Sequence, residues 1–280
     1  MQRVAIIGAG ELGGAVAHAL ARRDAARSIL LIDESGRIAA GKALDIAQSA
    51  PVEGFAAQLA GATDVSMAAG ADVIVVADRA GRGEWQGEEG LALLKRVIGS
   101  ARAAIVVFAG ATQRDLVERG AGGPGIDRAR IFGSAPEALA GGARALAALA
   151  VDGSPRDISL SVLGVPPDHT VIPWADATIA GFALTRLIDE PARRRLVARI
   201  AALWPPGPYA LAAASAKAAG AMFGRTRAVV SCFVAPDDSE GRRKRTAALP
   251  ARLNARGIER VVCPELHSAD RVALDNAMLL

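Results

Sequence analysis

The sequence has little of several residue types that mark particular protein classes. Its 280 residues include two cysteines, Cys232 and Cys263, which form no C-x-x-C pair, and this argues against a disulfide scaffold or a cysteine-ligated metal. Aromatic residues make up 4%, so no stacking platform for single-stranded nucleic acid is visible. No apolar run reaches the roughly 18 residues of a membrane span. The short apolar stretch after Met1 lacks a signal-peptide cleavage site. We predict a soluble, cytoplasmic protein with no metal, membrane or nucleic-acid partner.

Positive charge is in slight excess and mostly dispersed along the chain. The formal net charge is +4 and the pI is about 9.6. Two basic clusters stand out, at residues 193–195 and 242–245. Such a cluster can bind phosphate or nucleic acid, but a solvated face is the commoner interpretation, and it is the one we expect here. Hydrophobic residues at 51% exclude a disordered chain, and the length suffices for one large domain or two of moderate size.

The first third of the chain alternates short apolar runs with longer amphipathic segments. We expect strands at Val4–Ile7, Ile29–Ile32, Val73–Val76 and Ile105–Phe108. Helices are expected at Gly14–Arg22 and at Lys42–Ala50, the second ended by Pro51. Strands that are apolar throughout and alternate with helices are typical of a parallel sheet covered on both faces.

The remainder of the chain has a mixed pattern. A loop is expected at residues 120–125 (GAGGPG). Helices are expected at Pro136–Ala150, Ala175–Ile188, Pro191–Leu203 and Ala210–Met222, and strands at Ala228–Val234 and Arg260–Cys263. We therefore predict an α/β fold with a Rossmann-type doubly wound parallel sheet in residues 1–134. A second, α+β domain is expected in residues 135–280.

The first expected strand leads into a glycine-rich motif. Residues 8–13 read G-A-G-E-L-G, which is G-x-G-x-x-G placed between a strand and a helix. Gly8 allows a tight turn, Gly10 lets the backbone approach a pyrophosphate, and Gly13 allows close helix–strand packing. The helix N-terminus offers unpaired N–H groups to phosphates. Asp33, at the end of the second strand, would accept hydrogen bonds from the adenosine ribose and favour NAD over NADP. The predicted cofactor-binding residues are Gly8, Gly10, Glu11, Leu12, Gly13 and Asp33.

Three segments resemble a known family. They are residues 5–10 (AIIGAG), residues 41–55 (GKALDIAQSAPVEGF) and residues 70–76 (GADVIVV). Together they make the stretch Val4–Asp72 similar to the malate/lactate dehydrogenase family, closest to its malate dehydrogenases, and the similarity continues more faintly to Leu274. The resemblance implies an NAD domain followed by a substrate domain of the malate/lactate dehydrogenase type. It further implies a 2-hydroxy or 2-oxo acid substrate and a homodimer or homotetramer.

The same resemblance implies where catalytic groups should lie in the first half of the chain. In the family, arginines clamp the substrate carboxylates from a loop after the third strand. Here Arg82 falls on the first arginine, whereas Glu88 falls on the second, which reverses the charge. A glycine beside the cofactor is replaced by Arg79. The asparagine that contacts substrate and nicotinamide falls on Ala109.

The second half of the chain departs further from the family pattern. The Leu-Asp-x-x-Arg motif falls on residues 138–142 (ALAGG), so the histidine-orienting aspartate and the substrate arginine are missing. Arg144 lies two residues further on, and one gap in the alignment would shift it into the substrate position. The proton-carrying histidine falls on Pro166 or Pro167, and proline cannot shuttle a proton. His169 is the remaining candidate. A small residue further along is replaced in the pair at residues 207–208 (GP).

Three hypotheses remain open at this point. In the first, the protein binds NAD(H) but has a degraded 2-hydroxyacid site with weak or no dehydrogenase activity, and acts as a nucleotide-sensing or partner-binding subunit. In the second, it is an active NAD-dependent oxidoreductase with a rebuilt site that uses Arg82, His169 or Arg144 on a malate- or lactate-like acid. In the third, Asp78 and Arg79 disturb the pyrophosphate site and no cofactor binds.

Overall fold

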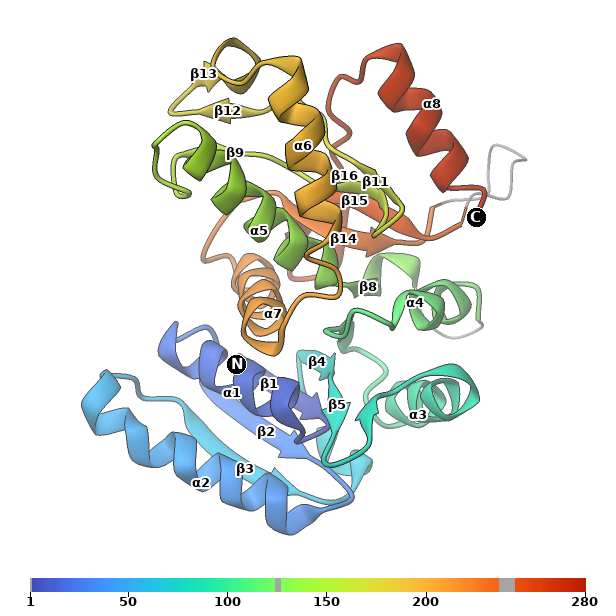
Figure 1. Ribbon diagram of the computed structural model, residues 1–280. Helices are drawn as coiled ribbons and strands as arrows, with labels where there is room; N and C mark the ends of the chain where they lie inside the picture. Colours follow the sequence, from blue (N-terminus) through green and yellow to red (C-terminus); the bar gives the residue numbers. More distant parts are fainter. Residues whose placement is uncertain (1, 124–126, 237–244) are drawn as a thin grey trace.

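The computed structural model describes residues 2–123, 127–236 and 245–280. Within these residues an 11-stranded sheet runs through the whole molecule (Figure 1). One half of this sheet is built of parallel strands in the order β3 (Gln58–Ala62), β2 (Ser28–Ile32), β1 (Arg3–Ile7), β4 (Val73–Val76), β7 (Ile105–Phe108) and β8 (Ile131–Gly133). This is the strand order of a Rossmann domain, and it confirms the predicted doubly wound fold.

Helices connect the parallel strands and cover them. They are α1 (Glu11–Arg22), α2 (Gly36–Glu53), α3 (Gly87–Ser100) and α4 (Arg114–Ala121), with short 3₁₀ turns η1 (Val65–Ala68) and η2 (Arg128–Arg130). The four residues of β4 and of β7 are buried, as are the last four of β1. Their Val- and Ile-rich composition suits strands covered on both faces, because branched side chains pack well on a buried pleated surface.

Antiparallel strands extend the sheet into the second half of the chain. They are β14 (Val230–Val234), β15 (Ala247–Asn254), β10 (Leu163–Val165) and β11 (His169–Val171), with β16 (Gly257–Val261) paired to β15. A separate small sheet joins β9 (Ile158–Ser159), β12 (Thr178–Ile179) and β13 (Phe182–Ala183), followed by the 3₁₀ turn η3 (Leu184–Arg186). The helices of this half are α5 (Ala135–Ala150), α6 (Glu190–Ala201), α7 (Pro208–Met222) and α8 (Ser268–Ala277).

One helix joins the two halves. Figure 1 shows α7 between α1 and α5, and it packs against both. Its sequence, PYALAAASAKAAGAM, is dominated by alanine, and most of its residues are buried. Small side chains allow helix backbones to approach closely. The main hydrophobic cluster accordingly contains residues from both halves, and the predicted boundary at residues 134/135 falls between β8 and α5. The division into two domains stays a prediction.

Two predicted helices were wrong in part or in whole. Ala175–Ile188 is not a helix, because Ala180 and Gly181 have φ values of +48° and +86° and turn the chain between β12 and β13. The helix predicted at Lys42–Ala50 is longer, and Pro51 does not end it. Proline in the last turn removes one backbone hydrogen bond, and α2 continues until Gly54 adopts a left-handed conformation with φ +78°.

Other segments have different bounds from those predicted, or were not predicted at all. The strand predicted at Arg260–Cys263 begins earlier, as β16, and β15 was not predicted at all. The loop predicted at residues 120–125 starts two residues later than predicted, because Gly120 and Ala121 belong to α4. Residues 124–126 lie outside the described part of the chain.

Candidate nucleotide site and the positions of the catalytic groups

The glycine loop connects the carboxyl end of β1 to the start of α1. Gly8 has φ +110°, and a Cβ on it would lie 2.3 Å from the carbonyl oxygen of Asp78. A Cβ on Gly13 would lie 2.0 Å from the carbonyl oxygen of Gly8, so helix and strand pack together only because this residue is glycine. The strand, the loop and the helix therefore have the geometry that a dinucleotide-binding unit requires.

Asp33 follows β2 at the same edge of the sheet, as the sequence indicated. Its carboxylate is 7% exposed and accepts hydrogen bonds from the N–H groups of Ala9 (2.8 Å), Ser35 (2.9 Å) and Ala80 (3.0 Å). A carboxylate offers about four lone-pair positions. The protein itself uses most of them, and it uses them to hold the glycine loop and the segment after β4.

The side chain of Asp78 occupies the N-terminus of α1. Its carboxylate accepts hydrogen bonds from the N–H groups of Gly13 (2.8 Å) and Leu12 (3.2 Å). The carbonyl oxygen of Asp78 accepts from the N–H of Gly10 (2.9 Å). A Cβ on Gly10 would lie 2.3 Å from Oδ2 of Asp78. The place where a pyrophosphate would lie is thus taken by a carboxylate of the same chain, which has to move before a dinucleotide can bind there.

Two other predicted cofactor residues lie beside this carboxylate. Leu12 is buried, whereas Glu11 is exposed at the first turn of α1 and borders a cavity that also includes Lys42. The ammonium group of Lys42 donates a hydrogen bond to the carbonyl oxygen of Gly10. A positive charge therefore lies directly next to the glycine loop.

Asp78 belongs to a short hairpin made of β5 (Asp78–Arg79) and β6 (Gly83–Glu84). Opposite Asp78 in this hairpin, the Glu84 carboxylate accepts hydrogen bonds from the N–H groups of Ala111 (3.0 Å) and Thr112 (2.9 Å). The guanidinium of Arg79 forms an ion pair with Glu89 (2.6 Å) and lies 4.4 Å from the centre of the Trp85 ring. Both strands of the hairpin are consequently held at the carboxyl edge of the sheet.

The two predicted catalytic residues lie in different parts of the sheet. Arg82, on the hairpin, is 64% exposed and pairs with Glu34 (3.5 Å), which follows β2. His169 is exposed at the start of β11, the outermost strand. Seven strands lie between β11 and β2 in the sheet order. The arrangement does not bring the two side chains to one point.

The positions that the family resemblance assigns to the aspartate and the substrate arginine carry no charged side chain. Leu139 is 1% exposed and belongs to a hydrophobic cluster with Ala140 and Leu196. Gly142 has no side chain, and it lines a cavity together with Arg144 and Lys217. Ala109, at the asparagine position, is fully buried. None of these places offers an ionisable group.

Glu88, at the second arginine position, is a fixed negative charge. It lies in the first turn of α3 and forms an ion pair with Arg119 (2.6 Å). The hydrogen bond from Arg119 holds the pKa of Glu88 below its ordinary value. The position that carries an arginine in the family thus carries a carboxylate here, and its charge is balanced by Arg119.

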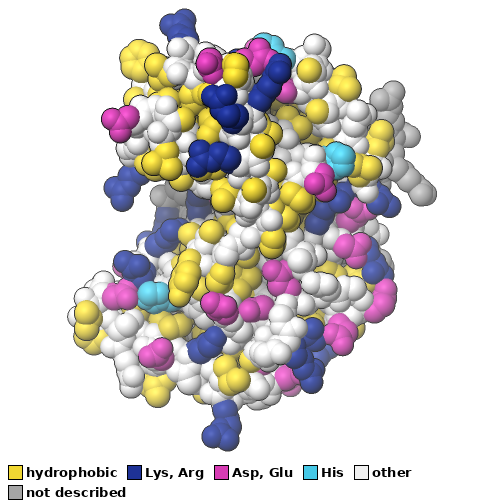
Figure 2. Space-filling model, in the orientation of Figure 1, with side chains coloured by type: hydrophobic (Ala, Val, Ile, Leu, Met, Phe, Trp, Pro, Cys, Tyr) yellow, Lys and Arg dark blue, Asp and Glu magenta, His cyan; other side chains and the backbone are white. Residues whose placement is uncertain are grey.

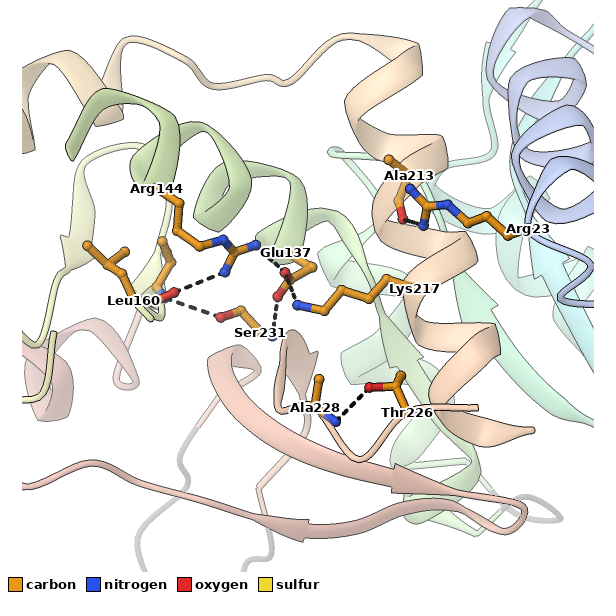
Figure 3. A network of polar contacts seen from close by, with 10 residues as sticks. Arg23, Glu137, Arg144, Leu160, Ala213, Lys217, Thr226, Ala228 and Ser231 are labelled. Carbon is orange, nitrogen blue, oxygen red and sulfur yellow. Dashed lines mark hydrogen bonds and ion pairs between the residues drawn. The ribbon is translucent and has the colours of Figure 1, made fainter. Parts of the chain in front are cut away.

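A polar cluster that sequence reasoning missed lies in the second half of the chain (Figure 3). Glu137 of α5 is 3% exposed and accepts hydrogen bonds from Lys217 of α7 (2.6 Å), from Arg144, and from the N–H of Ser231 in β14 (2.9 Å). Arg144 also donates to the carbonyl oxygen of Leu160 (3.0 Å). Arg144 is therefore paired with Glu137 in this structure. The signal was a lone acid within the apolar start of α5.

The basic clusters are dispersed in space. Figure 2 shows basic side chains over α6, where Arg194 is 79% exposed and pairs with Glu190. Of the second cluster, residues 242–244 lie outside the described part of the chain, and Arg245 pairs with Glu118 (3.6 Å). Among the described residues, no cluster of three or more His, Cys, Asp or Glu side chains could hold a metal ion, and no helix has the length and apolarity of a membrane span.

The strand order and the strand–glycine loop–helix unit define an α/β protein of the dinucleotide-binding class. Residues 2–107 match the family model of the lactate/malate dehydrogenase NAD-binding domain. Malate dehydrogenase from Desulforudis audaxviator (strain MP104C) is 27% identical over 99% of this chain and 95% of its own length. Malate dehydrogenase from Thioalkalivibrio sulfidiphilus (strain HL-EbGR7) is 28% identical over 99% and 96%.

Solved structures share the fold of the whole chain. A malate dehydrogenase from Salinibacter ruber superposes with a TM-score of 0.85 at 22% identity, over 98% of this chain and 93% of its own. A Cryptosporidium parvum lactate dehydrogenase, solved with lactic acid and nicotinamide adenine dinucleotide, gives 0.85 at 21% identity, over 99% and 94%. The chain is therefore similar to malate and lactate dehydrogenases over its whole length, and its residues 2–107 match the NAD-binding domain of that family.

Proposed function

We propose that this protein binds NAD(H) but carries out little or no 2-hydroxyacid dehydrogenation. The observation that supports this most is that Leu139 and Gly142 stand at the positions of the family's aspartate and substrate arginine. The family reaction needs an aspartate to orient a histidine and an arginine to hold a carboxylate, and neither leucine nor glycine can do this. Losing general acid–base catalysis alone removes about 10²- to 10⁴-fold in rate.

The retained glycine loop supports NAD(H) binding by a protein that no longer catalyses 2-hydroxyacid dehydrogenation. Gly8, Gly13 and Asp33 keep the geometry of a dinucleotide loop. Within this proposal the protein acts as a nucleotide-sensing or partner-binding subunit. A cytoplasmic location remains a prediction from the cysteine content and the N-terminal sequence, and a homodimeric or homotetrameric assembly remains a prediction from the family resemblance.

Purified protein should be assayed with NADH and a panel of 2-oxo acids that includes oxaloacetate and pyruvate. We expect saturable NADH binding by calorimetry and no turnover above the rate without protein. Oxidation of NADH at ordinary dehydrogenase rates would refute the proposal. It would support the alternative, an NAD-dependent oxidoreductase with a rebuilt site. The His169→Ala variant then tests that alternative, because unchanged activity would remove His169 from the mechanism.

A further inference from the structure

We propose that Asp78 is a built-in competitor of the NAD(H) pyrophosphate, so that the nucleotide binds only when the hairpin of residues 78–84 releases this carboxylate. The inference rests on the proposed nucleotide binding. It assigns to the hairpin a regulatory contact at that site.

Four N–H groups of the glycine loop already have acceptors within the protein. Those of Leu12 and Gly13 donate to the Asp78 carboxylate, and that of Gly10 donates to the Asp78 carbonyl oxygen. The N–H of Ala9 donates to Asp33. A helix N-terminus stabilises an anion through these groups. A carboxylate that accepts two of them serves the helix as a phosphate would, and it excludes a second anion from the same place.

The rest of the hairpin holds Asp78 in position. The N–H of Ala80 donates to Asp33, which ties the hairpin to the end of β2. Glu84 accepts from Ala111 and Thr112 and ties it to the loop after β7. A Cβ on Gly110 would lie 2.3 Å from the Glu84 carboxylate, so the loop admits this side chain only because residue 110 is glycine. Both carboxylates of the hairpin are received by backbone N–H pairs at the crevice where α/β sheets bind ligands.

The closed hairpin also carries a cost that favours its release. In the described part of the chain, Nε of Arg79 and Nε1 of Trp85 are buried without a hydrogen-bond partner. Leaving buried donors unsatisfied destabilises the state that buries them. Opening the hairpin would return both groups to water, while Lys42 stays beside the loop as a cation for the incoming phosphates.

Competition of this kind lowers the apparent nucleotide affinity by the fraction of molecules that are open. We expect the Asp78→Ala variant to bind NADH about tenfold more tightly, or better, than the unaltered chain. The Asp78→Asn variant keeps the shape, loses the charge and should lie between them. The matched control is Asp72→Asn: this carboxylate also accepts a backbone N–H, from Arg3 (2.8 Å), but at the opposite edge of the sheet. Its NADH affinity should not change.

The measurements are NADH titration by calorimetry and amide hydrogen exchange without nucleotide. In the unaltered chain the amides of Leu12 and Gly13 should be protected, and in both Asp78 variants they should exchange faster. Equal NADH affinity in the unaltered chain and in the Asp78 variants would overturn the inference and leave the proposed function intact. Absence of binding in all of them at millimolar NADH would overturn the proposed function, and the inference with it. If the alanine variant does not fold, the asparagine variant gives the same comparison.

Discussion

Glu137 gives the sharpest test of how α5, α7 and β14 are held together in the second half of the chain. In the Glu137→Gln variant the side chain keeps its size but loses its charge. Lys217 and Arg144, whose side chains are 29% and 19% exposed, then lose their shared carboxylate, and the N–H of Ser231 loses a charged acceptor. Lys217 belongs to α7 and Ser231 to β14, both of which pack against α5, and Arg144 lies in α5 itself.

Removing one partner of a buried ion pair typically costs about 3–5 kcal/mol. The partial exposure of both cations reduces this, so we expect the free energy of unfolding to fall by about 2–4 kcal/mol. At about 2 °C per kcal/mol for a chain of this size, the midpoint of thermal unfolding should drop by about 4–8 °C. Urea denaturation followed by circular dichroism measures the first quantity, and calorimetry measures the second.

The control is Glu190→Gln, the same substitution in an exposed glutamate–arginine pair. Glu190 and Arg194 have side chains that are 62% and 79% exposed, so the loss should be about 0–1 kcal/mol. A Glu137→Gln variant that is no less stable than this control would refute the reasoning. A Glu137→Met/Lys217→Met double variant should recover part of the loss, because replacing both partners leaves fewer buried charges unpaired.

Three further predictions concern single residues. Burial raises the pKa of the Cys232 thiol well above its ordinary value, so a thiol reagent should modify exposed Cys263 quickly and Cys232 only after unfolding; equal rates would contradict the structure. Because Arg119 depresses the pKa of Glu88, the ion pair stabilises the fold above the ordinary pKa of glutamate and is lost as pH falls through the depressed value. Glu88→Gln should therefore be less stable than the unaltered chain at neutral pH, and this difference should shrink in acid denaturation series. Gly8→Ala should lower stability by about 3 kcal/mol in urea, since its Cβ would meet the Asp78 carbonyl oxygen at 2.3 Å.

The amino-terminal half was readable from the sequence because its determinants are local. Four apolar strands and a glycine loop can each be recognised from a few consecutive residues. The strands β4 and β7 were predicted with their observed bounds. Asp33 was placed correctly at the end of β2, since it follows directly from the strand's length. The pattern of hydrophobic residues predicted the wrong structure where two backbone φ angles determine the course of the chain. The segment at residues 175–188 has a helical composition, but the positive φ values of Ala180 and Gly181 make it a turn between short strands.

The contacts of the candidate site were harder to predict from the sequence, because they join residues that are far apart in the chain. Asp78 reaches Gly13 across 65 positions, and Glu137 reaches Ser231 across 94. The sequence could suggest that Asp78 disturbs the phosphate loop, but not that its carboxylate takes the place of the phosphate. That result depends on where the hairpin of β5 and β6 folds back, which no local pattern specifies.

The alanine-rich helix α7 limits which substitutions this protein tolerates. An alanine loses almost no side-chain entropy when it is buried, so the contact between the two halves forms cheaply. It also has no torsion with which to make room for a larger neighbour. A substitution of alanine by serine or glycine along α7 changes the polarity or flexibility of the helix but leaves the distance between the helices unchanged. A branched side chain facing α1 would push the nucleotide-binding half of the chain away from the second half. Size, rather than polarity, is the property that substitutions on this helix have to respect.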